Sequence, residues 1–292
     1  MMRRRDDLGF STLELLVTMA LLVLMVSQIL GVVGAQQENA AVHEDVLETQ
    51  EDVRLVSELI SSDVRMAGFM VPRIVGIASI DGGNANSDTV CVSDYQSIDL
   101  ASLVGVGDRF DGAKITSTLG GTSSNVALAP TELDIDNDGD IDFAVNGGLI
   151  VSDGNRTHCA RITALDTSTG AASFTPPTPG GFSVGTAFTR VAPAVVYEVG
   201  GNGLLRNNVP FAAQVEDVQI QFVVGGTTVN SIDTQDANSL TTVLLSVVAR
   251  ADRDDLDTVP GQLPPVANRV AGPADTFRRR VLTNRIAPRN YL

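Results

Sequence analysis

The sequence is poor in the residue types that most enzymes use for catalysis. It has no tryptophan, two cysteines and two histidines, and aromatic residues make up 4% of its 292 residues. Few aromatics leave little surface on which nucleic acid bases could stack. Two histidines with two cysteines leave little material for a zinc site or a Cys/His catalytic pair. No other arrangement of catalytic groups stands out, so we expect a protein that is not an enzyme.

Positive charge is also scarce. Lysine and arginine number 20 against 35 aspartates and glutamates, which gives a formal net charge of −15. A protein that binds nucleic acid has to neutralise phosphates with a basic face, so we expect no nucleic acid partner. Hydrophobic residues make up 43% of the chain and charged residues 19%, a composition typical of a folded protein with a core.

One long apolar run lies near the N-terminus. The 21 residues from Leu15 to Ala35 include no charged residue, and three arginines, Arg3 to Arg5, precede them. As a helix this run would span about 30 Å, the thickness of the hydrocarbon core of a bilayer. Arginines before such a run favour the cytoplasmic face. We therefore expect a single pass through a membrane, with the start of the chain at the cytoplasmic face.

Three kinds of membrane segment fit this pattern. The first is a secretory signal cleaved after Val33-Gly34-Ala35, which would leave Gln36 as the first residue. The second is a plain anchor. The third depends on Glu14, whose carboxylate stands at the start of the apolar run, where a charge costs on the order of 2 to 3 kcal/mol. A free amino terminus, created at Phe10 by cleavage after Gly9, would be a suitable partner for that charge.

The stretch GFSTLELLVTMALLVLMVSQILG, which begins at Gly9, resembles the N-terminus of type IV prepilins. In that family a membrane-bound prepilin peptidase cuts after the glycine and methylates the new terminal phenylalanine. The resemblance implies that Gly9 ends a leader of residues 1–9 and that Phe10 begins a helix, 10–35, that passes from the membrane into a filament core. It also implies that Glu14 pairs with the terminal amine of a neighbouring pilin subunit during assembly.

Helical periodicity continues beyond the apolar run. Between residues 36 and 69, valines and isoleucines recur at spacings of three, four or seven positions, from Val42 to Val64, with acidic residues on the other sides. This pattern predicts one helix from about Leu13 to Met66, roughly 80 Å long, whose second half packs on a sheet.

Three further stretches resemble PilW-like minor pilins, a group related to the J-type minor pseudopilins of type II secretion. The first is LVSELISSDVRMAGF, in which Ser62 stands where the group has an arginine before Asp63. The other two run from Val195 to Val224 and from Phe277 to Asn290. The resemblance covers about the first 70 and the last 100 residues.

Residues 70–292 are predicted to form a β-rich head domain. Short runs that favour strands recur between turn-forming residues, and VYEVGGNGLLR, from Val196 to Arg206, predicts a hairpin with a glycine-rich turn. Pro176-Pro177 and the segment Ala251–Asp275 predict loops. The predicted fold class is therefore α+β: a long N-terminal helix packed on an antiparallel, pilin-like head. The other runs expected to be strands are DTVCVSDY, ALAPTELDI (127–135), LIVSD, VQIQFVV and SLTTVLLSVVAR.

The two cysteines, Cys91 and Cys159, both lie in the predicted head. In an exported domain they can oxidise and close a loop of about 70 residues, which contributes roughly 4 kcal/mol in the chain-entropy model. The alternative is a pair of unlinked buried thiols. We expect the disulfide because the membrane segment predicts export.

The segment LDIDNDGDIDF, from Leu133 to Phe143, has an aspartate at every second position and glycine at the sixth position from Asp134. Calcium takes six to eight oxygen ligands, and glycine permits the sharp turn that brings such ligands together. The pattern resembles the calcium loops of EF-hands, dockerins and integrin-type repeats, although Val145 replaces the glutamate of the EF-hand. We expect one Ca²⁺ site in residues 134–142, the alternative being a solvated acidic turn. Its ligands would be Asp134, Asp136, Asp138 and Asp142 through side chains and Asp140 through its backbone carbonyl.

These expectations combine into a structural subunit. The resemblance implies a minor pilin that acts in priming or at the tip of a type IV pilus, with other pilins, the prepilin peptidase and the inner membrane as partners. It also implies a location in the bacterial inner membrane with the head in the periplasm, and then in a pilus or pseudopilus at the cell surface. One alternative is a minor pseudopilin of a type II secretion system. Another is a secreted calcium-dependent adhesive domain with an ordinary signal peptide.

Overall fold

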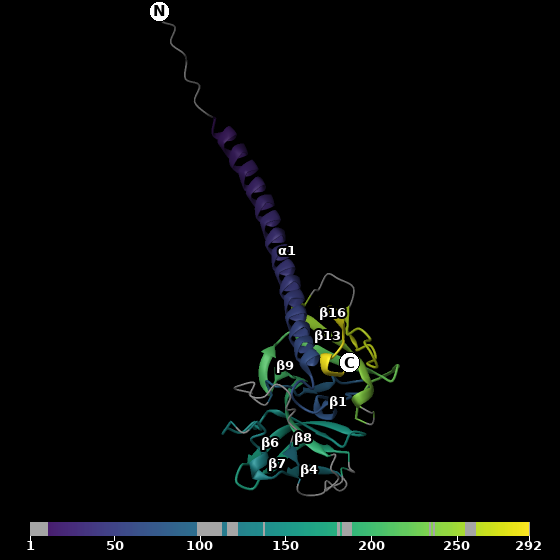
Figure 1. Cartoon of the computed structure of the whole chain (residues 1–292). Coiled ribbons are helices and arrows are strands. Elements are labelled where there is room, and N and C mark those ends of the chain that lie inside the picture. Colours follow the sequence, from purple (N-terminus) through teal and green to yellow (C-terminus); the bar gives the residue numbers. More distant parts are fainter. Residues whose placement is uncertain are drawn as a thin grey trace, which may run out of the picture. The chain divides into compact units, whose positions relative to one another are not determined.

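The computed structural model describes residues 11–97, 113–115, 122–136, 138–179, 182, 189–233, 235, 237–254 and 261–291 (Figure 1). The chain divides into two compact units, residues 1–47 and residues 48–292. The single long helix α1 (Thr12–Met66) contributes to both units, and the described strands all lie in the second.

Helix α1 begins and ends as its sequence predicts. Ser11 precedes the first turn, and its hydroxyl oxygen accepts a hydrogen bond from the backbone N–H of Leu13 at 3.3 Å. At the other end Gly68 adopts a left-handed backbone conformation (φ 74°), which glycine reaches without a Cβ clash. The side-chain amide of Asn290 donates to the terminal carbonyls of Met66 and Ala67. The predicted helix is confirmed.

The last turns of α1 form part of the core of the second unit. Val53, Val56, Ile60 and Val64 are buried at the three- and four-residue spacing of one helical face. They pack with apolar residues of a four-stranded antiparallel sheet. The order in that sheet is β12 (Thr227–Val229), β11 (Val215–Val224), β13 (Leu240–Asp254) and β16 (Phe277–Ile286).

The second sheet turns a corner along strand β8 (Arg190–Gly200). The first half of β8 pairs with β5 and β3, whereas its second half pairs with β2 and β9. The main order is β1-β2-β8-β5-β6-β7-β4, with β9 and β10 beside β8, and every described pair is antiparallel. The remaining strands are β1 (Ile77–Ile80), β2 (Thr89–Val92), β3 (Ala113–Lys114), β4 (Ser123–Ala127), β5 (Gly148–Ser152), β6 (Thr157–Asp166), β7 (Ala171–Thr178), β9 (Gly203–Arg206) and β10 (Val209–Ala212).

A disulfide crosses the inside of this corner. Cys91 on β2 and Cys159 on β6 are bonded, with their Cα atoms 5.6 Å apart, although two other strands separate β2 from β6 in the sheet. Both cysteines are fully buried among small apolar residues such as Ala78 and Ala192. The bond therefore joins the two halves of the bent sheet, in agreement with the expected pairing.

The α+β class predicted from the sequence is confirmed, with three local corrections. In the run 127–135 only Ala127 belongs to a strand, because Pro130 starts a short 3₁₀ helix, Pro130–Glu132. Pro176-Pro177 lies inside β7 instead of forming a loop. Proline is tolerated there because the pairing with β4 skips these two positions. The segment expected to be a loop from Ala251 includes the end of β13 and a small pair of strands, β14 (Gly261–Gln262) and β15 (Ala274–Asp275).

Candidate functional site

The predicted processing site lies at the edge of the described chain. Gly9 and Phe10 are outside the described residues, whereas Glu14 occupies the first turn of α1. A carboxylate in the first turn of a helix is stabilised by the positive end of the helix dipole. Its backbone N–H donates to the carbonyl of Ser11 at 3.0 Å, so Ser11 and Glu14 stand in the relative positions of a capping box. The position of Glu14 in the first turn therefore favours the start of the helix through the helix dipole.

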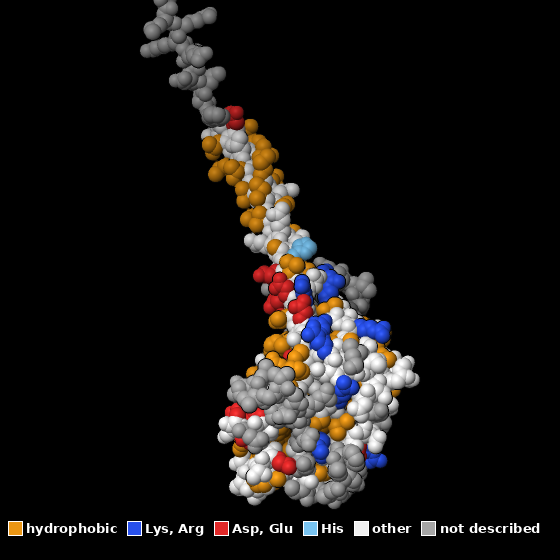
Figure 2. Space-filling model, viewed as in Figure 1, with side chains coloured by type: hydrophobic (Ala, Val, Ile, Leu, Met, Phe, Trp, Pro, Cys, Tyr) orange, Lys and Arg blue, Asp and Glu red, His pale blue; other side chains and the backbone are white. Residues whose placement is uncertain are grey.

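The apolar part of α1 is exposed along its length. The helix contains a segment long and apolar enough to cross a membrane, and none of that segment is buried. Figure 2 shows hydrophobic side chains around this part of the helix. Its hydroxyl groups are satisfied locally, since Thr18 and Ser27 donate to the carbonyls of Leu15 and Leu24. An exposed apolar surface of this length is typical of segments that contact lipid or a protein partner.

A buried polar cluster joins the end of α1 to the β8–β9 hairpin. The hydroxyl of Tyr197 donates to the Asp63 carboxylate at 2.5 Å, and the Arg206 guanidinium donates to the Tyr197 oxygen at 3.1 Å. A nitrogen of Arg206 also lies 3.5 Å from the same carboxylate. Burial, reinforced by the charge of Asp63, raises the pKa of Tyr197 well above its usual value. This cluster holds the hairpin against the helix, and the sequence did not predict it, because 134 residues separate Asp63 from Tyr197.

The aspartate-rich loop brings three of its five predicted ligands together. Carboxylate oxygens of Asp134, Asp136 and Asp138 lie within 4.8 Å of one another. The backbone N–H groups of Asp138 and Gly139 donate to the two oxygens of Asp134 at 3.2 and 3.0 Å, and Gly139 adopts φ 107°. Asn137 is outside the described residues. The turn therefore presents an all-oxygen donor set of the kind that hard divalent cations bind.

Asp142 approaches the same turn from its C-terminal side. One carboxylate oxygen accepts a hydrogen bond from the N–H of Ile135 at 2.5 Å. The other is buried without a hydrogen-bond partner in the described part of the chain. Burial raises the pKa of Asp142 to about 7, and the charges of Asp136 and Asp134 add to the effect. The buried oxygen is compatible with a cation that supplies the missing partner. Asp140 is exposed, and its N–H donates to Asp138 at 3.1 Å.

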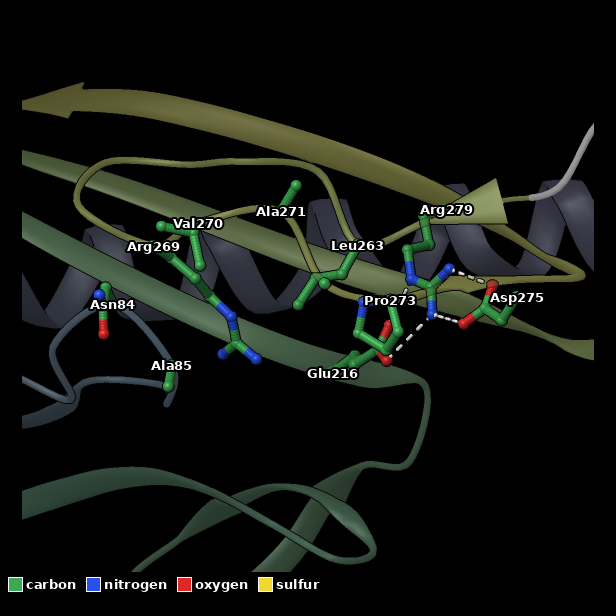
Figure 3. Close-up of a pocket in the computed structure, with 11 residues that line it drawn as sticks. Asn84, Ala85, Glu216, Leu263, Arg269, Val270, Ala271, Pro273, Asp275 and Arg279 are labelled. Carbon is green, nitrogen blue, oxygen red and sulfur yellow. Dashed lines mark hydrogen bonds and ion pairs between the residues drawn. The ribbon is translucent and has the colours of Figure 1, made fainter.

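A hollow of about 360 Å³ lies beside β11 and the segment from Leu263 to Arg279 (Figure 3). Arg279, nearly buried, forms ion pairs with Glu216 (2.6 Å) and Asp275. Arg269 forms another ion pair with fully buried Asp217 at 2.8 Å. Both arginines thus hold the C-terminal segment against β11, and we assign the ion pairs beside this hollow a role in stability.

Comparison with known proteins leaves the family unassigned. No family model matches the chain, and no curated protein matches its sequence. Among solved structures, a type IV-like pilin from Thermus thermophilus aligns with the chain at 11% sequence identity. The alignment covers 83% of this chain and 96% of that one, with a TM-score of 0.37.

Proposed function

We propose that this chain is a non-catalytic, pilin-type structural subunit, and more specifically a minor pilin of a type IV pilus. The observation that carries the proposal is the construction of α1. After Glu14 in its first turn, α1 continues as an exposed apolar helix without charged residues from Leu15 to Ala35, and its last part supplies core residues of a β-rich domain. A subunit of this kind can remain in the membrane until assembly. Its apolar helix then replaces its contacts with lipid by contacts with the apolar helices of neighbouring subunits. The resemblance of residues 9–31 to prepilins supports the same role.

The test is the mature N-terminus of the protein recovered from the cell envelope. Intact-mass and N-terminal peptide analysis should find a chain that begins at Phe10 with a methylated amine, and only when the prepilin peptidase is present. A Glu14→Gln variant should be cleaved equally well but be depleted from assembled filaments, because it lacks the charge that pairs with a neighbour's terminal amine.

The other outcomes separate the alternatives. A chain beginning at Phe10 that enters filaments sheared from the cell surface supports the pilus. One that begins at Phe10 but remains in the envelope favours a type II pseudopilin. A chain beginning at Gln36 contradicts the assembly role and favours a secreted adhesive domain.

We also propose that residues 134–142 bind one Ca²⁺ ion. The clustered carboxylates of Asp134, Asp136 and Asp138 and the unpartnered buried oxygen of Asp142 support this proposal. Asp140 would contribute its backbone carbonyl. Bound Ca²⁺ would neutralise the repulsion between these carboxylates and hold the loop that leads into β5.

Thermal unfolding of the detergent-purified full chain tests the site. Ca²⁺ at about 100 times its Kd should stabilise the head domain by roughly 2.7 kcal/mol. The double variant Asp134→Asn/Asp138→Asn should lose this response, whereas the exposed Glu58→Gln control should keep it. An equal response to Mg²⁺, or none to millimolar Ca²⁺, would contradict the proposal.

A further inference from the structure

The turn between β5 and β6 contains a motif for covalent modification. Asn155-Arg156-Thr157 has the form Asn-X-Thr in which X is not proline, and this form is the acceptor for N-linked glycans on surface loops of secreted proteins. No other asparagine of the chain has a serine or threonine two positions later. The motif lies in the head domain, which the membrane segment predicts to be exported.

The backbone of this turn is held without the side chain of Asn155. The N–H of Asp153 donates to the carbonyl of Arg156 at 3.1 Å. The Asp153 carboxylate accepts hydrogen bonds from the N–H groups of Asn155 and Arg156, at 3.0 and 2.8 Å. The hydroxyl of Ser152 also donates to the carbonyl of Arg156 at 2.9 Å. The turn therefore keeps its shape whatever is attached to the Asn155 side chain.

Asn155 is exposed, and the usual reasons for asparagine in a turn do not apply to it. Turns favour asparagine because its side chain bonds nearby backbone groups and because it tolerates a left-handed conformation. Asn146, Asn207 and Asn208 adopt positive φ angles, whereas Asn155 does not. Within the described residues the side-chain amide of Asn155 makes no hydrogen bond. Its amide nitrogen is thus available for a bond to a bulky group that extends into solvent.

Thr157 supplies the hydroxyl of the motif and is buried in the folded head. It is 1% exposed at the start of β6, and its hydroxyl lies 3.1 Å from that of Ser152. An enzyme that binds this hydroxyl must therefore reach it before β6 pairs with β5. This order suits a chain that folds after it has crossed a membrane. Once the head has folded, the exposed position of Asn155 leaves an attached glycan outside the core.

We propose that Asn155 is the acceptor of an N-linked glycan, transferred from an oligosaccharide that is joined through pyrophosphate to a membrane lipid. A bond forms between the side-chain nitrogen of Asn155 and the anomeric carbon of the first sugar, and the bond from that carbon to the pyrophosphate oxygen breaks. The lipid pyrophosphate leaves with the bonding electrons, and the amide nitrogen releases one proton. This inference rests on the proposed function only in requiring that the head leaves the cytoplasm.

Mass spectrometry of the chain recovered from the envelope of cells that produce it naturally tests the proposal. Reduction of the disulfide and digestion with chymotrypsin release peptides that contain Asn155 and Thr157. These peptides should carry the added mass of a sugar chain, placed on Asn155 by fragmentation, and the intact chain should show the same added mass. Peptides unmodified at Asn155 in every preparation, or sugar found only on serine or threonine, would overturn the inference.

Variants test whether the motif directs the modification. Asn155→Gln should lose the glycan completely and still fold, because no contact of the turn uses this side chain. Thr157→Ser keeps the hydroxyl and should keep the glycan, whereas Thr157→Val should lose it although Asn155 remains. The matched control Asn202→Gln removes an exposed asparagine from the turn between β8 and β9 and should leave the glycan in place. Resistance of the head to protease shows that each variant is folded. A glycan that survives Thr157→Val contradicts the inference.

The same samples keep the two proposals apart. If the chain begins at Phe10 and Asn155 is unmodified, the glycan inference is wrong and the pilin-type function stands. A chain that begins at Gln36 and carries the glycan contradicts the proposed function and supports the modification, because a secreted domain is exported as well. A chain that is neither cleaved nor modified contradicts both.

Discussion

At the residue scale, Asp88 shows how a buried carboxyl can make stability depend on pH. Its side chain is fully buried, and its two oxygens accept hydrogen bonds from the N–H groups of Gly82 (2.8 Å) and Ile220 (2.7 Å). Burial nevertheless raises its pKa to about 7, and the charges of Asp81 and Asp217 add to the effect. Asp88 therefore joins the loop 81–88 to β11 most favourably when it is protonated.

The sign of the pH dependence follows from this pKa. Between pH 4 and 7 the folded state retains a proton that the unfolded state has lost, so stability falls as pH rises through that window. Between pH 4.5 and 7.5 the loss from Asp88 should be of the order of 2 to 4 kcal/mol. The variant Asp88→Asn cannot ionise and should lack this part of the loss. Urea unfolding of the detergent-purified chain in EDTA at pH 4.5 and 7.5 measures this change in the free energy of unfolding.

Asp166 offers a matched control for that measurement. It is exposed, and hydrogen bonds from Ser168 and Thr169 lower its pKa to about 2. The contribution of the ionised Asp166 carboxylate to folding stability is complete above pH 4, and it is lost only as pH falls towards 2. Asp166→Asn should therefore leave the difference between pH 4.5 and 7.5 unchanged. An Asp88→Asn variant with the full wild-type difference would show that Asp88 is ionised in the folded protein.

At the scale of elements, features that depend on nearby residues could be predicted from the sequence. Helix α1 follows from its apolar run, its periodic valines and Gly68, and the hairpin between β8 and β9 follows from its glycine-rich turn. The aspartate cluster was predictable for the same reason, because a single turn between residues 134 and 139 brings its carboxylates together.

Features that depend on distant pairing could not be predicted in this way. Nothing local in β8 indicates that its two halves pair with different strands, and this division depends on four other strands, β2, β3, β5 and β9. From the sequence alone, Pro176 and Pro177 predict a loop. They can lie inside β7 because β4, its neighbour in the sheet, does not pair with these two positions. The sequence marked residues 277–290 only by a resemblance to PilW-like minor pilins. That β16 stands at the end of its sheet among the described strands appears only once β13 is known to be its partner.

At the scale of the whole molecule, helix α1 is exposed along its apolar segment and buried on one face of its last turns. The compact β-rich unit begins at Glu48, so it includes the last turns of α1 but not the apolar segment. In those turns Val53, Val56, Ile60 and Val64 are between 0% and 4% exposed. The exposed apolar segment and this buried face belong to one continuous helix.

Two truncated chains test this division. A chain of residues 36–292 should fold in aqueous buffer without detergent, because it keeps every buried residue of α1. A chain of residues 70–292 should not fold. Fully burying a valine or isoleucine contributes about 1.5 to 3 kcal/mol, and loss of four such side chains rivals the roughly 5 to 15 kcal/mol that holds a typical domain together. Far-UV circular dichroism and protease resistance distinguish the outcomes, and a folded 70–292 chain would show that α1 packs on the head without being part of its core.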